Sequence, residues 1–247
     1  MESLNSHVLV EISEGLSCIG SNLCDPYASD RDRPLKEVFV SMFEISKYPT
    51  TFRQLDTFLI ESGWPHPLTD PEPRQDLRQM LRDHPDYPAT YISWETADAY
   101  CRWLAERSGL NVVLPTEAEW EKAARGGDDR IWPWGNEFRA DLCNSSESGR
   151  NDFCSVFEYE QGASPYGCMH MAGGVWEWCY DFYHPYSHQW LTLLDPVNLT
   201  PSRQHVVKGG SAFCTKEIVR PAGRDWTNSI NQGGGDDGFR IAVRPRS

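Results

Sequence analysis

The chain has 247 residues, of which 39% are hydrophobic and 24% charged, and its formal net charge at pH 7 is −13. These values are ordinary for a soluble globular protein with one substantial core, so we expect a single domain over residues 1–247. The acidic balance argues against a nucleic-acid partner, because phosphates would be repelled. The sequence contains no run of about 18 apolar residues, the length that a membrane-spanning helix needs. We therefore expect no membrane partner.

The eight cysteines show no paired Cys-x-x-Cys spacing, which argues against a structural zinc site. The first six residues, Met-Glu-Ser-Leu-Asn-Ser, lack the basic and apolar regions of a secretory signal. Because intracellular cysteines generally stay reduced, we expect free thiols and a cytoplasmic protein.

The N-terminal part of the chain predicts two strands and a helix. Residues 7–19 alternate apolar and polar side chains, which is typical of an edge or hairpin strand. Residues 38–45 form a second alternating stretch. Thr50 or Thr51 then caps a helix whose apolar side chains recur at helical spacing, at Phe52, Leu55, Phe58 and Leu59.

A proline-rich, charged segment follows and precedes a second helix. We expect residues 65–88 to form a surface loop with one short helix near residues 75–81. Ser93 caps the second helix and Gly109 ends it. The helix buries a stripe made of Ala97, Tyr100, Cys101 and Leu104.

A third, shorter helix opens with a capping box. Thr116 and Glu119 have the spacing in which each side chain binds the other's backbone amide, and Gly126 and Gly127 end the helix. Beyond it the sequence predicts only short strands and loops. The fold class is therefore α+β, with few regular elements and long ordered loops.

Two tryptophans flank one carboxylate in the stretch 164–181, at Trp176 and Trp178 around Glu177. Indoles next to a glycine turn are large core anchors, so we expect both to be buried. A carboxylate between them is costly to bury unless it meets a cation or backbone donors. Glu177 should therefore not be free in water.

Ordered phrases along nearly the whole chain resemble the formylglycine-generating-enzyme, or sulfatase-modifying-factor, family. The family's usual signature is Met-Ala-Gly-Asn-Val-Trp-Glu-Trp, and the run at 171–178 matches it except that Gly174 replaces the asparagine. Further phrases match in order: "ATYISWETADAYCRWLAERSG" at 89–109, "LPTEAEWEKAARGG" at 114–127, "WPWGNEF" at 132–138, "VVKGGS" at 206–211 and "GFRIAV" at 238–243. The resemblance implies a C-type-lectin-like fold.

Active members of this family oxidise a cysteine of a substrate peptide to formylglycine, using a copper(I) ion held by two cysteine thiolates that follow a Gly-Gly-Ser. The first cysteine matches Cys214, after Ser211, and these are the candidate catalytic residues. The second position falls on Val219, which cannot bind a metal. Another cysteine, at 179, 168 or 154, could supply the second copper ligand. The sequence nevertheless favours a packing role for Cys214, as a small apolar residue that is buried or half-buried.

The resemblance also implies structural calcium in ordered loops. One site would use Asn144, the Ser145 carbonyl and Asp152. A second would use the Gly173 and Val175 carbonyls and the Glu177 carboxylate, although His170 replaces its usual asparagine. The alternative for Glu177 is an ion pair with an arginine such as Arg240.

Two functions fit these residues. The first is a family variant that binds a peptide, protein or small molecule on the surface of residues 206–240, with Arg224, Trp226, Asn228, Ser229 and Asn231 as contacts. Such a surface is the part that diversity-generating retroelements randomise in some proteins of this fold. The alternative is an oxygen- and copper-dependent oxidase of a peptidyl cysteine or another thiol. An accessory role in a biosynthetic cluster is a weaker third hypothesis.

Overall fold

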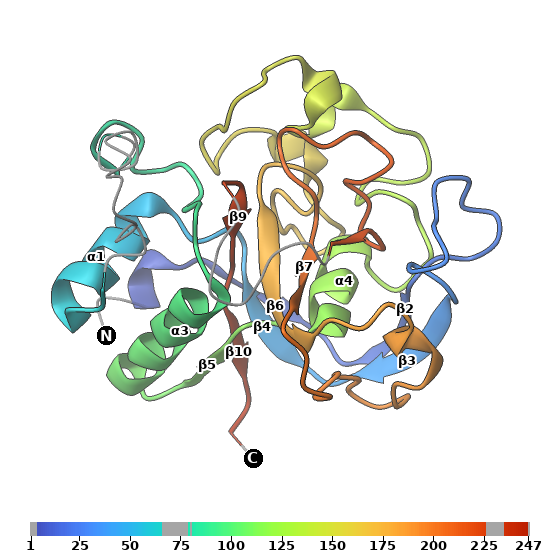
Figure 1. The fold of residues 1–247 in the computed structure, drawn as a ribbon, viewed down its shortest axis with the longest axis horizontal. Helices are drawn as coiled ribbons and strands as arrows, with labels where there is room; N and C mark the ends of the chain where they lie inside the picture. Colours follow the sequence, from blue (N-terminus) through green and yellow to red (C-terminus); the bar gives the residue numbers. More distant parts are fainter. Residues whose placement is uncertain (1–3, 66–78, 80, 226–234, 247) are drawn as a thin grey trace.

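The computed structural model describes residues 4–65, 79, 81–225 and 235–246. Two four-stranded sheets and one hairpin form the framework, with helices beside them (Figure 1). The first sheet has the order β1-β4-β10-β5, the hairpin pairs β2 with β3, and the second sheet has the order β8-β7-β6-β9. Their bounds are β1 Leu9–Ile12, β2 Gly15–Ile19, β3 Lys36–Val40, β4 Phe43–Ser46, β5 Asn111–Val113, β6 Trp176–Phe182, β7 His205–Lys208, β8 Arg224–Asp225, β9 Asp237–Gly238 and β10 Ala242–Arg244.

The three predicted helices are confirmed, with their predicted caps. Helix α1, Phe52–Ser62, begins at the capping residue Thr51, and α3, Trp94–Ser108, begins at Ser93. Helix α4, Glu117–Arg125, opens with the reciprocal hydrogen bonds of Thr116 and Glu119. Short 3-10 turns occur at Leu4–Ser6, Ala140–Leu142, Ser146–Ser148, Glu160–Gly162 and Ser187–Gln189.

Each of the two predicted N-terminal strands is in fact two strands. The stretch 7–19 divides into β1 and β2, and the stretch around 38–45 divides into β3 and β4. Strand β1 pairs with β4 while β2 pairs with β3, so the chain changes sheets at both breaks. The buried positions change phase across the second break, from Val38 and Val40 to Phe43 and Ile45. Both short stretches are still compatible with one alternating strand in the sequence, so the break was not predicted. Of the short helix predicted at 75–81, the structure describes helical residues only at 79 and 81–83.

The helices lie in two places around the sheets. Helices α1 and α3 contact each other, and α3 packs on β5, whereas α4 packs between the β2–β3 hairpin and strands β6 and β7 (Figure 1). Trp176 and Trp178 are 5% and 0% exposed and join the core cluster that covers α1 and α3, which confirms the prediction for both. A second core cluster surrounds Trp120 of α4.

Within the described part of the chain, none of the helices combines the length and apolar character that a membrane crossing requires. The eight cysteines are all free thiols in this structure.

Candidate functional site

Cys214 lies in a tight turn that follows two glycines. Gly209 and Gly210 have positive φ angles of 93° and 70°, which glycine adopts without strain. The Ser211 hydroxyl lies 3.4 Å from the Cys214 Sγ, and the Cys214 amide donates to the Ser211 carbonyl at 3.0 Å. Ser211 is buried and Cys214 is half-buried. The turn thus brings the two predicted catalytic residues together.

Val219 lies against this turn. It is fully buried in a cluster with Trp132, Cys143 and Ala172, and Cys214 packs against the same cluster. A Cβ atom added at Gly210 would lie 2.8 Å from the Val219 Cγ1, so the turn and the valine are in close contact. An isopropyl group offers no donor atom. The side chains at this turn therefore do not fit a two-thiolate copper(I) site.

The three cysteines named as substitutes lie elsewhere. Cys168 and Cys179 belong to the core cluster around Trp120, and the Cys154 Sγ lies 3.4 Å from the side-chain nitrogen of Asn144. None of the three belongs to the clusters against which Cys214 packs. Among the described residues, no three histidine, cysteine or carboxylate side chains are grouped as a metal site.

Sequence reasoning missed Cys143, the cysteine that shares a cluster with Val219. It directly precedes Asn144, and nothing in its sequence neighbourhood indicates that it would lie near the Cys214 turn. Burial raises the pKa of the Cys143 thiol to about 11, and burial also raises the pKa of Cys214 despite its hydrogen bond from Ser211. Both groups are therefore thiols rather than thiolates near neutral pH, which makes them weak nucleophiles.

Glu177 forms a buried ion pair with Arg240, the alternative considered for it. The Arg240 Nε and Nη2 lie 2.5 and 2.7 Å from the two carboxylate oxygens, and the Trp120 indole donates to Oε2 at 2.7 Å. Both side chains are completely buried. The ion pair uses both carboxylate oxygens, and calcium held by this carboxylate with the Gly173 and Val175 carbonyls stays a prediction.

The other predicted calcium residues lie next to each other. The Asn144 side-chain nitrogen donates to the Asp152 carbonyl at 2.9 Å. The backbones of Asn144 and Gly173 form an isolated parallel β-bridge. However, the Ser145 carbonyl already accepts from the amide and the hydroxyl of Ser148, at 3.0 and 2.7 Å. Calcium at this site stays a prediction.

Arg224 is an internal residue rather than a surface contact. Its guanidinium lies 2.7 Å from the Glu117 carboxylate, and its side chain is fully buried. This placement does not match the predicted role in ligand binding. The other four predicted ligand contacts, Trp226, Asn228, Ser229 and Asn231, lie outside the described residues.

The buried charges around α4 form a network that the sequence did not reveal. Lys208 lies 2.9 Å from Glu121 and 3.5 Å from Glu117, which also contacts His188 at 3.2 Å. Asp181 accepts from the Glu117 amide at 2.8 Å, and burial together with the Glu117 carboxylate raises its pKa to about 7. This network fixes the start of α4 against β6 and β7, which indicates a structural role.

The fold, the Gly-Gly-Ser turn and the buried Glu177–Arg240 pair define a C-type-lectin-like domain of the sulfatase-modifying kind. Residues 3–245 match the profile described as the sulfatase-modifying factor enzyme 1-like domain. The chain belongs to this family.

Known relatives agree with this assignment. The formylglycine-generating enzyme of Thermomonospora curvata is 28% identical, over 96% of this chain and 93% of its own. The structure of PvdO from Pseudomonas aeruginosa has a TM-score of 0.82 at 22% identity, and covers 96% of this chain and 94% of its own. Treponema denticola variable protein 1 has a TM-score of 0.76 at 19% identity, covering 96% and 95%.

Proposed function

We propose that this protein is a binding member of the family in which the Cys214 turn is not a copper centre. The observation that carries the proposal is Val219, which is fully buried against the turn where the active enzymes place a second thiolate. With valine at position 219, Cys214 and the hard hydroxyl of Ser211 do not form the two-thiolate pair that copper(I) prefers.

The surroundings of the turn support binding of a peptide, protein or small molecule by residues 206–240. Phe213 is 52% exposed and stacks edge-on against Phe153, with ring centroids 5.3 Å apart. An exposed aromatic held by a buried one is a rigid contact of the kind that interfaces use. Asp225 and Asp236 lie close enough to Cys214 to interact with it electrostatically, which places carboxylates beside the turn.

The competing function is a copper-dependent oxidase of a peptidyl cysteine or another thiol. The experiment that separates the two gives the purified protein copper(I), oxygen and a Cys-x-Pro-x-Arg peptide, and follows oxygen consumption and peptide mass. We expect no turnover above that of the Cys214→Ser variant. Turnover that Cys214→Ser abolishes would establish the oxidase and refute the proposal.

The name of the Treponema denticola relative motivates a narrower form of the proposal, in which residues 211–237 are a diversified surface. The gene sequence tests this form. Diversification predicts adenine-rich codons in that window and a near-copy of the segment nearby. Ordinary codons and the absence of a near-copy would refute diversification, and the surface would then be a fixed binding surface.

A further inference from the structure

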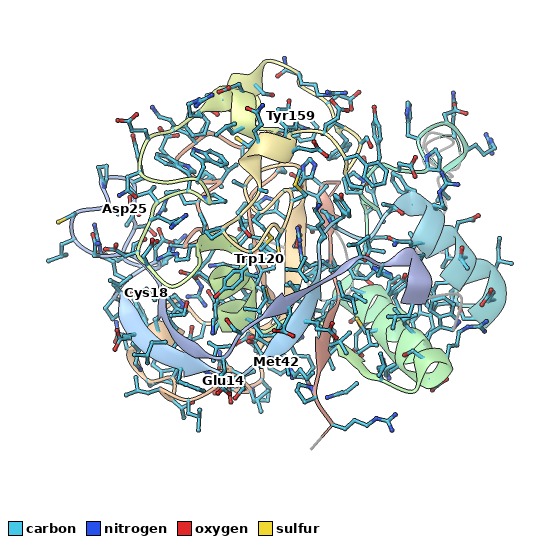
Figure 2. The ribbon with its side chains drawn as sticks, turned by 180° about the vertical axis from the view of Figure 1, so that it is seen from behind. Glu14, Cys18, Asp25, Met42, Trp120 and Tyr159 are labelled. Carbon is cyan, nitrogen blue, oxygen red and sulfur yellow. The ribbon has the colours of Figure 1, made fainter. Side chains whose placement is uncertain are left out.

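A groove on another part of the molecule shares no residue with the Cys214 turn. Its volume is about 750 Å³, within the range of ligand sites. The turn between β3 and β4, the start of α4, the segment 195–199 and the chain after β10 form its walls. Figure 2 shows Met42 and Glu14, two of its lining residues, at the lower edge of the molecule, far from Tyr159 at the opposite edge.

The walls of the groove are mainly apolar. Val40 and Ala118 are buried beneath it, whereas Met42, Leu199 and Tyr180 remain 38%, 58% and 36% exposed. Exposed apolar side chains that gather around one hollow indicate a binding surface more than isolated ones do. The groove therefore provides apolar contacts that solvent now covers.

A second hollow of about 320 Å³ extends the groove across the first sheet. The two hollows share Met42, Arg244, Pro245 and Arg246. The two hollows therefore adjoin and define a path from the segment 195–199 to β1 and β5 across the first sheet. Adjoining hollows lined by several separate elements suit an extended chain segment.

The charges along this path are mainly negative. Glu11 and Glu44 line the second hollow and are directly opposite in the β1–β4 register, an arrangement that costs stability. In the described part of the chain, neither has an ion pair or a side-chain hydrogen bond. A cationic partner would relieve the repulsion between these two carboxylates, so their position favours one.

The cations nearby do not cancel this charge. Arg244 holds Glu119 through two bonds of 2.7 and 2.9 Å, so this pair is neutral overall. The buried Lys122 ammonium donates to three carbonyls and interacts electrostatically with Glu14 and Asp195. Counting Arg246 as well, five carboxylates face three cations, an excess of two negative charges.

We propose that the groove binds an extended peptide segment of a partner protein that carries both basic and apolar side chains. The apolar side chains lie between Met42 and Leu199, and the basic ones face Glu11 and Glu44. The proposal does not depend on the function of the Cys214 turn, because the two surfaces share no residue.

The experiment uses two capped fluorescent peptides, Lys-Leu-Lys-Leu-Lys and Glu-Leu-Glu-Leu-Glu, and fluorescence anisotropy with the full-length protein at low salt. We expect the lysine peptide to bind at least about tenfold more tightly than the glutamate peptide. Glu11→Gln/Glu44→Gln should weaken binding of the lysine peptide by about three- to tenfold, because two exposed charge contacts are lost. Met42→Ala should weaken it severalfold at unchanged net charge.

The matched control is Glu137→Gln/Glu160→Gln, which makes the same change in net charge at exposed sites outside the groove. It should leave binding within about twofold of the unaltered protein. Equal losses in the two double variants would mean non-specific attraction to an acidic protein and would overturn the proposal. Unchanged binding in both Glu11→Gln/Glu44→Gln and Met42→Ala, or equal affinity for the two peptides, would also overturn it.

Discussion

The Glu177–Arg240 pair gives a stability prediction that can be worked out from its contacts. Replacing Arg240 by methionine removes the guanidinium donors of the Glu177 carboxylate and leaves it, among the described residues, the Trp120 indole. A buried ion that loses its partner typically costs about 3–5 kcal/mol. We therefore expect Arg240→Met to lower the free energy of unfolding by about this amount.

Glu177→Gln should cost less, about 1–3 kcal/mol. The amide oxygen of glutamine can still accept from the guanidinium, and Arg240 keeps its contacts with three main-chain carbonyls, those of Ser46, Lys47 and Met169. The asymmetry follows from the partners that each variant leaves behind. It would not follow from the loss of packing volume alone.

Urea unfolding of the two single variants and the double variant measures these costs. We expect the double variant to be less destabilised than the sum of the single ones, by about 1–3 kcal/mol. Costs that add within about 0.5 kcal/mol would show that the two side chains act independently, and would refute the reasoning. The opposite order, with Glu177→Gln the more damaging, would also refute it.

The remaining predictions concern the core, the histidines, calcium and the thiols. Trp176→Ala should cost about 3–5 kcal/mol because the indole is core, and an unchanged denaturation midpoint would contradict this. Burial lowers the pKa values of three histidines, His7, His170 and His205, to about 4. The unfolded chain then binds more protons than the folded one between pH 6.5 and 4, so these groups reduce stability as the pH falls through that range. Their ring signals in NMR spectra should not shift between pH 8 and 5, and a midpoint near 6.5 would show that the rings are solvated. If the Asn144 loop binds calcium, millimolar calcium should raise the melting temperature relative to a chelator, and Asn144→Ala should remove the difference. Denatured, unreduced protein should titrate eight free thiols, whereas a lower count would reveal disulfides.

Local signals in the sequence predicted the helices well. Thr51, Ser93 and the Thr116–Glu119 box each satisfy the first backbone amides of their own helix, so their effect depends on residues at most three positions away. The breaks within the N-terminal strands were not predictable in the same way. They depend on which distant strand offers a partner, and a period of two is the same in either sheet.

The candidate site was predicted in part, because motifs reveal which residues are present but not which distant residues they meet. The pairing of Ser211 with Cys214 follows from three positions of spacing. The partner of Glu177 lies 63 residues away, and the Arg224–Glu117 pair spans 107. Arg224 therefore resembled a surface contact in the sequence, although the fold places it inside.

Copper(I) affinity, measured against a competing chelator, tests the central claim most directly. The account predicts that the unaltered protein leaves copper(I) with the chelator, because Cys214 has no second thiolate. Val219→Cys should take copper(I) from the chelator without unfolding, since cysteine is no larger than the valine it replaces, and Cys214→Ser in that background should reverse the gain. If the unaltered protein binds copper(I) as tightly as Val219→Cys, a second soft ligand is already present and the account is wrong.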